Sequence, residues 1–186
     1  MSIVNKDASY SHHTMAPDGN VPNNLSLPVL YYKHVLQSDA GEQAIKNLFS
    51  ENGWKDSWTG DIYTYHHYHS TAHEVLAVLS GNCMVELGGD DGNIQKVQQG
   101  DVLVLPAGVA HKNVGASADF KCIGAYPEGQ QYDMNYCKPE ELEAAVENIS
   151  KVPLPAKDPV FGEQGALVEL WRHEESEKFA DHERQF

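Results

Sequence analysis

Short runs of apolar and polar residues, punctuated by glycine, dominate the middle of the chain. From residue 60 onward, "IYTYHHYH", "EVLAVLSG", "CMVELGG", "IQKVQQG", "DVLVLPAG" and "FKCIGAYP" follow one another at close spacing. Between two of them, "GGDDGN" at 88–93 has the composition of a hairpin turn. This succession of short strands predicts an all-β fold, an antiparallel barrel or sandwich with few helices.

The segments on either side of these strands have different patterns. "PVLYYKHVL" at 28–36 predicts one more strand, and "AGEQAIKNLFSENGW" at 40–54 predicts a short helix because its apolar residues recur at helical spacing. "KPEELEAAVENI" at 138–149 predicts a second helix, with a proline in its first turn and acidic residues at its positive end. The segment "VPLPAKDPVFGEQGALVELW" at 152–171 is punctuated by proline and then has a strand-like pattern.

The length of 186 residues and this order of patterns predict a single domain with an extension at each end. Residues 1–26 are rich in Asn, Ser, His and Pro and are expected to form an N-terminal arm that is ordered by packing against the body. Residues 27–172 are expected to form the domain, and residues 173–186 a charged, solvated C-terminal tail.

Charge and cysteine content exclude several classes of protein. Acidic residues outnumber basic ones by 27 to 13, and a formal net charge of -14 repels nucleic-acid phosphates and anionic lipids, so we expect no nucleic-acid or membrane partner. No apolar run reaches the roughly 18 residues of a membrane span, and the start of the chain lacks a secretory layout, so we expect a cytoplasmic protein. The three cysteines lie far apart, which fits neither a disulfide framework nor a Cys-x-x-Cys zinc or redox site.

A histidine-rich stretch, "TYHHYHSTAHE" at 64–74, offers candidate metal ligands. In a strand, His67 and His69 project from the same face with attachment points about 6.6 Å apart, so the two imidazoles can converge on one ion. Tyr63 and Tyr65 share this face and are expected to pack inside the barrel. They are also weak catalytic candidates, because a buried tyrosine hydroxyl near a metal can orient a substrate.

The remaining ligands have to come from neighbouring strands, because one strand cannot surround a metal ion. Glu74 begins the next predicted strand, and His111 follows the turn after "DVLVLPAG", where its side chain can be aimed into a barrel. His66 points away from the face of His67, and His73 points away from the face of Glu74. For His66 and His73 we therefore expect a supporting or surface role rather than a place among the ligands.

These residues form two motifs that resemble those of the cupin superfamily. "HYHSTAHEVLAVLSG" has the His-x-His, glutamate and glycine of the first motif, and "GDVLVLPAGVAH" has the two glycines, proline and histidine of the second. The matching positions are His67, His69, Glu74 and Gly81 in the first motif, and Gly100, Pro106, Gly108 and His111 in the second. The resemblance covers residues 60–126 by motif; around it, "PNN" at 22–24, "GAYPEGQQYD" at 124–133 and "PAKDPVFG" at 155–162 resemble the small, mostly uncharacterised bacterial cupins of the YjlB type.

The resemblance implies a double-stranded β-helix, or RmlC-like jelly-roll barrel, whose mouth holds one divalent metal on His67, His69, His111 and Glu74. Three imidazoles and one carboxylate suit Fe, Mn, Ni, Co, Cu or Zn and leave coordination sites for water, oxygen or substrate. A metal-dependent enzyme of dioxygenase or related oxidoreductase type is the leading interpretation. The alternatives are a cupin isomerase or lyase, and a non-catalytic cupin that binds a metal or small ligand as a sensor or store.

The positions of the arginines limit the class of substrate that we expect. The only arginines are Arg172 and Arg184, so the predicted barrel strands hold no guanidinium that could clamp a dicarboxylate or a phosphate. We expect a small neutral or weakly anionic organic molecule as the substrate. The sequence leaves open whether the chain forms a homodimer and whether the segments at 124–133 and 155–162 cover the barrel mouth.

Overall fold

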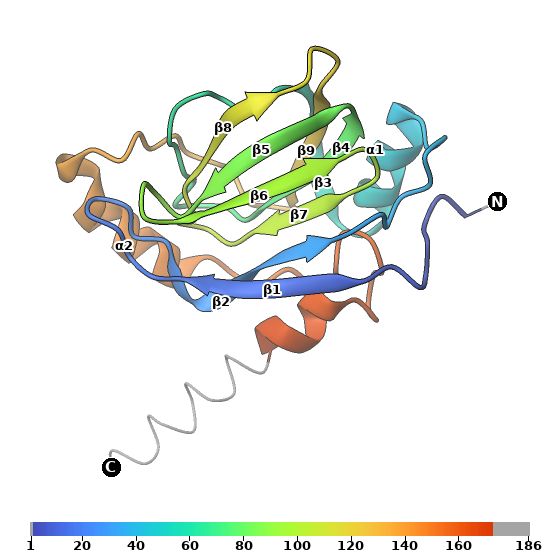
Figure 1. Ribbon diagram of the computed structural model, residues 1–186. Coiled ribbons are helices and arrows are strands. Elements are labelled where there is room, and N and C mark those ends of the chain that lie inside the picture. The colour runs from blue at the N-terminus through green and yellow to red at the C-terminus, as the bar shows by residue number, and fades with distance from the viewer. Residues whose placement is uncertain (1, 173–186) are drawn as a thin grey trace.

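Two antiparallel β-sheets face each other in the computed structural model, which describes residues 2–172 (Figure 1). The larger sheet has the strand order β1-β2-β7-β4-β9-β3, and the smaller sheet has the order β6-β5-β8. The strands are β1 (Tyr10–Met15), β2 (Asn24–Tyr32), β3 (Trp54–Gly60), β4 (Glu74–Ser80), β5 (Asn82–Leu87), β6 (Asn93–Gln98), β7 (Val102–Leu105), β8 (His111–Ala116) and β9 (Lys121–Pro127). The architecture is the all-β jelly-roll barrel that the sequence predicts.

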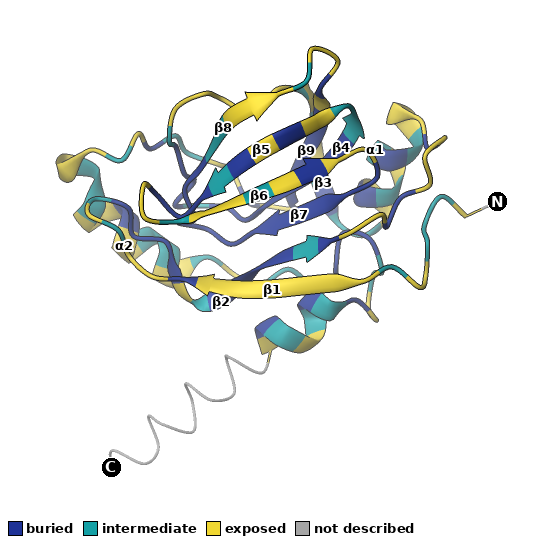
Figure 2. Cartoon of the chain, in the orientation of Figure 1, coloured by how far each residue is buried: buried dark blue, intermediate teal, exposed yellow. Residues whose placement is uncertain are grey.

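Apolar side chains from both sheets fill the space between them. On β4, Leu76 and Val78 point into this space, whereas Val75 and Ala77 point to the outer face, as the alternation along a strand requires. Strand β7 is buried along its whole length, whereas β1 lies largely exposed at the edge of the larger sheet (Figure 2). The cluster between the sheets contains Met15, Val29, Ile62, Leu76, Val78, Cys83, Val85, Leu87, Val97, Leu103, Leu105, Val109, Phe120 and Cys122.

Short helices flank the sheets. Helix α1 (Glu42–Glu51) packs on the outer face of the larger sheet through Ile45 and Phe49, which are both buried. A single turn, η1 (Pro139–Glu141), leads into α2 (Leu142–Lys151). These elements confirm the two helices expected from the sequence, and "GGDDGN" forms the turn between β5 and β6, as predicted.

Residues 166–172 form a helix, so the strand-like interpretation of this segment is wrong. Leu167 and Trp171 are each 1% exposed and one helical turn apart, so the buried positions repeat every four residues rather than every two. The buried carboxylate of Asp158 accepts hydrogen bonds from the Leu167 main-chain N–H and from the Tyr32 hydroxyl. These bonds fold the proline-punctuated stretch back onto β2 and place the helix there.

Residues 61–73, between β3 and β4, form a loop, so the strand predicted for "IYTYHHYH" is also wrong. The main-chain groups of this loop bond one at a time to residues of two separate segments, and no continuous ladder forms. The bonds are Asn113 N to Tyr63 O, His67 with His111 in both directions, Tyr68 with Asn135 in both directions, and Gly108 N to His69 O.

The two ends of the chain can be compared with the arm and the tail expected from the sequence. Residues 10–15 of the expected N-terminal arm form β1, which pairs with β2, and β2 begins at Asn24, just before the expected domain boundary. The expected C-terminal tail, residues 173–186, lies outside the described residues, and the division into arm, domain and tail stays a prediction. Within residues 2–172, every helix is too short or too polar to cross a membrane.

Candidate metal centre

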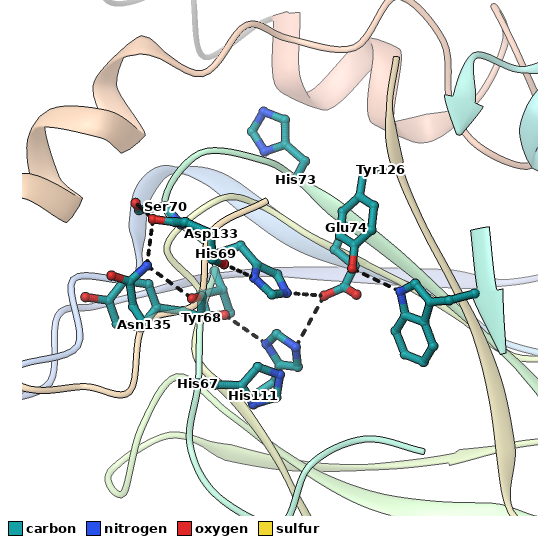
Figure 3. A network of polar contacts seen from close by, with 12 residues as sticks. His67, Tyr68, His69, Ser70, His73, Glu74, His111, Tyr126, Asp133 and Asn135 are labelled. Carbon is teal, nitrogen blue, oxygen red and sulfur yellow. Dashed lines mark hydrogen bonds and ion pairs between the residues drawn. The ribbon is translucent and has the colours of Figure 1, made fainter. Parts of the chain in front are cut away.

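Three histidines and one glutamate, predicted as ligands from the sequence, lie together at one end of the barrel (Figure 3). His67 and His69 come from the loop between β3 and β4, Glu74 is the first residue of β4, and His111 is the first residue of β8. One ring nitrogen of each histidine lies within 4.8 Å of the corresponding nitrogens of the other two. Glu74 Oε2 lies 3.2 Å from His69 Nε2 and 3.3 Å from His111 Nε2.

Main-chain carbonyl groups hold all three rings in the same tautomer. Each Nδ1 lies within hydrogen-bonding distance of a carbonyl oxygen, which requires a hydrogen on Nδ1 and leaves Nε2 as the free lone pair of a neutral ring. The bonds run from His67 to Tyr65 O (3.1 Å), from His69 to Asp133 O (2.5 Å) and from His111 to Val109 O (3.2 Å). This anchoring through Nδ1 is the usual arrangement of histidines that bind a metal through Nε2.

Burial and mutual proximity set the protonation of these groups. Burial alone would raise the pKa of Glu74, but His69 and His111 outweigh it and hold that pKa below its usual range. Burial opposes protonation of His69, and the Glu74 carboxylate overcomes it, so the pKa of His69 is raised. Burial and the neighbouring His111 lower the pKa of His67 to about 3, so His67 stays neutral at physiological pH.

The donor set fits a divalent transition metal. Among residues 2–172, no group donates a hydrogen bond to the buried Glu74 Oε2, although two imidazole nitrogens face it. Without a cation, the arrangement is favourable only if a proton is added to one of these rings, and a metal would take the place of that proton. Three imidazole nitrogens and a carboxylate oxygen suit the metals from Mn to Zn, so the residue types do not select one of them.

A cavity of about 560 Å³ opens beside the four residues. Its wall is mainly aromatic and apolar, and among residues 2–172 no lysine or arginine lines it. Asp61 lies at this wall and is paired with the Lys121 ammonium at 3.0 Å. The aromatic and apolar lining residues are Trp58, Ile62, Tyr63, Leu76, Tyr126, Tyr132 and Met134. The volume lies within the range of small-molecule sites.

Comparison with known proteins places the chain in a family. The family model described as "Cupin domain" matches residues 58–123. The uncharacterized protein YjlB of Bacillus subtilis is 42% identical over 154 residues, which is 83% of this chain and 92% of that protein. The chain belongs to the cupin superfamily.

Two solved structures have a distant similarity to this cupin. RmlC from Streptococcus suis, in complex with dTDP-D-xylose, is 12% identical and matches 82% of this chain and 96% of that chain, with a TM-score of 0.40. Acireductone dioxygenase from Bacillus anthracis, which holds cadmium in its active centre, is 17% identical and matches 50% of this chain and 63% of that chain, with a TM-score of 0.37. At these identities and TM-scores, neither similarity bears on what this cupin binds.

Tyr63 and Tyr65 are not packed inside the barrel, which corrects the expectation from the sequence. Their side chains are 53% and 44% exposed, and their rings stack on each other with centroids 4.9 Å apart. Tyr63 lines the cavity and meets the His67 ring edge-on at 5.2 Å. The expectation failed because 61–73 is a loop, so strand alternation does not decide where its first residues point.

His66 and His73 lie outside the group of three histidines, as the sequence predicts. His66 Nε2 lies 3.2 Å from the Glu86 carboxylate and 3.1 Å from that of Asp90, so it ties the loop to the β5–β6 hairpin. The same Glu86 oxygen is also 3.2 Å from the Lys112 ammonium.

His73 is a buried structural residue. Its side chain is 1% exposed and packs against Trp171, and its Nδ1 accepts a hydrogen bond from the Ala107 main-chain N–H at 2.9 Å. Burial lowers the pKa of His73 to about 4, so it is neutral at physiological pH. It therefore supports the start of β4 from the outer side of the larger sheet, next to Glu74.

Sequence reasoning missed three residues of the site, all within "GAYPEGQQYD". Tyr126 and Tyr132 form part of the cavity wall, and Asp133 supplies the carbonyl that orients His69. The alternation from Cys122 through Gly124 could have placed Tyr126 on the inner face of β9. The segment at 124–133 thus borders the cavity, whereas no residue of 155–162 lines it.

Proposed function

We propose that this cupin is a metal-dependent enzyme, of dioxygenase or related oxidoreductase type, that acts on a small organic molecule beside a single divalent metal. The observation that carries the proposal is the convergence of three imidazole nitrogens and the Glu74 carboxylate on the wall of a cavity of about 560 Å³. A metal held there is next to space that a substrate can occupy.

Each protein group has a defined task in this proposal. His67, His69, His111 and Glu74 would hold the metal, which supplies Lewis acidity or oxygen activation when it is bound. The carbonyl groups that accept the three Nδ1 hydrogens fix the orientation of the rings and leave Nε2 of each ring to bind the metal. The aromatic and apolar wall excludes bulk water and binds the carbon skeleton of the substrate.

The cavity supports an enzyme, or a protein that binds a small ligand, over a protein that only stores or senses a metal. A storage site is complete when its ligands surround the ion, and it needs no room for an organic molecule beside it. The wall also limits the class of substrate. Among residues 2–172 no lysine or arginine lines the cavity, so a di- or trianionic substrate meets no lysine or arginine of the wall to pair with. A neutral molecule, or one that loses a single proton at the metal, fits better.

An oxygen-consumption screen tests the proposal. Protein loaded separately with Fe²⁺, Mn²⁺, Co²⁺ or Ni²⁺ is supplied with thiols, catechols, diketones and oxo-acids, and products are identified by mass spectrometry. We expect turnover with one metal and one substrate class, and loss of turnover in Glu74→Gln, which keeps the shape of the side chain but removes the charge. Absence of turnover with every metal and substrate would favour the non-catalytic binding protein.

A further inference from the structure

The Glu74 carboxylate lies between the phenol of Tyr126 and the rings of His69 and His111 (Figure 3). We infer that Tyr126 is a positioning residue that holds the Glu74 carboxylate in place for the metal, and that Trp58 sets the direction of the Tyr126 hydroxyl. The inference rests on the proposed metal centre and adds two residues that lie outside its four ligands.

The hydrogen bonds around the Tyr126 hydroxyl give it a direction. The Trp58 indole N–H donates to this hydroxyl oxygen at 3.0 Å. Because an indole nitrogen can only donate, the hydrogen of the Tyr126 hydroxyl has to point to another acceptor. Val75 on β4 pairs with Ala125 on β9, so Glu74 and Tyr126 are cross-strand neighbours, and Figure 3 shows the phenol beside the Glu74 carboxylate. This carboxylate is the acceptor that we assign to the hydroxyl.

Trp58 can reach Tyr126 because of a glycine on the neighbouring strand. Trp58 on β3 pairs with Gly124 on β9, and Tyr126 lies two residues further along the same face of β9. A Cβ atom at position 124 would overlap the Trp58 indole. The glycine thus leaves the space in which the indole lies, beside the phenol that it orients.

Tyr126 is a hydrogen-bond donor at physiological pH. A tyrosine hydroxyl has an ordinary pKa of about 10 and so keeps its hydrogen, and the side chain of Tyr126 is only 4% exposed. A donor that stays protonated and is itself fixed by Trp58 restricts rotation of the Glu74 carboxylate. The carboxylate can then keep Oε2 directed at His69 and His111, where the metal would lie.

Binding of Co²⁺ tests the inference without any substrate. The variants are Tyr126→Phe, which removes the hydroxyl, and Trp58→Phe, which removes the indole N–H, with Tyr132→Phe as the matched control. Tyr132 stacks on Tyr126 with centroids 4.6 Å apart in the same cavity, and its phenol is half exposed. The readouts are the Co²⁺ dissociation constant and the visible absorption spectrum of the bound ion, which reports ligand geometry.

We expect Tyr126→Phe to weaken Co²⁺ binding about tenfold and to change the visible spectrum, because outer-shell partners of metal ligands have effects of this size. Trp58→Phe should change both readouts in the same direction, and Tyr132→Phe should leave both unchanged. If wild type binds Co²⁺ and both Tyr126→Phe and Trp58→Phe match it in affinity and spectrum, the inference is overturned while the metal centre stands. If wild type binds no Co²⁺, Fe²⁺, Mn²⁺, Ni²⁺, Cu²⁺ or Zn²⁺, the proposed function itself fails.

Discussion

His67 and His111 are hydrogen-bonded to each other through their main chains in both directions, at 3.3 Å and 3.0 Å, and their ring centroids lie 4.1 Å apart. The distance between these two imidazoles is therefore set by backbone bonds and does not depend on an ion. Replacing either histidine side chain leaves these two main-chain hydrogen bonds intact. Variants of the ligand residues are therefore expected to fold and to report on metal binding alone.

Metal binding should stabilise the folded chain. A ligand that binds only the folded state at a free concentration of 100 times its dissociation constant adds about 2.7 kcal/mol to the free energy of unfolding. We expect Co²⁺ or Zn²⁺ to raise the melting temperature of wild type and to have little effect on His111→Ala. Calorimetric scans of chelator-treated protein with and without metal measure this; an equal rise in both proteins would place the binding elsewhere.

The main-chain segment around Asp133 should determine the orientation of the His69 imidazole. The Asp133 carboxylate accepts hydrogen bonds from the Ser70 main chain (2.6 Å) and from Asn135 Nδ2 (2.9 Å), and these bonds hold the carbonyl that orients the imidazole. We expect Asp133→Ala to weaken metal binding about tenfold. Asp61→Ala is the control, since Asp61 lines the same cavity but contacts Lys121 at the surface. Calorimetric titration with Zn²⁺ compares the two, and equal affinities would show that Asp133 has no such role.

Gly124 should be intolerant of even one added methyl group. A Cβ there would overlap the Trp58 indole, so we expect Gly124→Ala to lower the free energy of unfolding by about 1–3 kcal/mol. Gly115→Ala in β8 is the control, because a Cβ at that position meets no atom within 4 Å. Urea unfolding of both variants gives the comparison, and a similar small change in the two would mean that the indole moves aside freely.

His73 should make the metal-free protein less stable in mild acid. Its pKa falls from 6.5 to about 4 on folding, so the unfolded chain binds a proton at pH 5 that the folded chain does not. This contribution is present above pH 6.5 and is lost as the pH falls toward 4, with a loss of about 2 kcal/mol between pH 7 and pH 5.

His67 and Glu74 also have pKa values lowered by folding, so the effect of His73 has to be taken as a difference. The free energy of unfolding of metal-free wild type and of His73→Gln is measured by urea at pH 7 and pH 5. Wild type should lose more stability than the variant; parallel losses would mean that His73 titrates normally.

The sequence was sufficient to predict the four candidate metal ligands that lie together. Two motifs separated by a long stretch of chain name His67, His69, Glu74 and His111, and His66 lies outside this group although the chain around it is a loop and not the predicted strand. The inner and outer faces of β4 also follow from alternation, because both sheets pack regularly there.

The remaining features depend on pairing between distant segments. Trp58 reaches Tyr126 only because β3 pairs with β9, and Asp133 meets His69 only because its loop runs beside residues 68–71. No local pattern carries either contact. The residue types of 61–73 favour a strand, but the main chain of this loop bonds to separate segments one residue at a time.

The most direct test of the central claim is the metal content of chelator-treated, reloaded protein in which adjacent histidines are replaced singly. His67 faces the other two imidazoles, whereas His66 contacts Glu86 and Asp90 on the opposite side. Inductively coupled plasma mass spectrometry should find one equivalent of metal in wild type and in His66→Ala, and far less in His67→Ala. A full equivalent in His67→Ala, or an equal loss in both variants, would contradict the account.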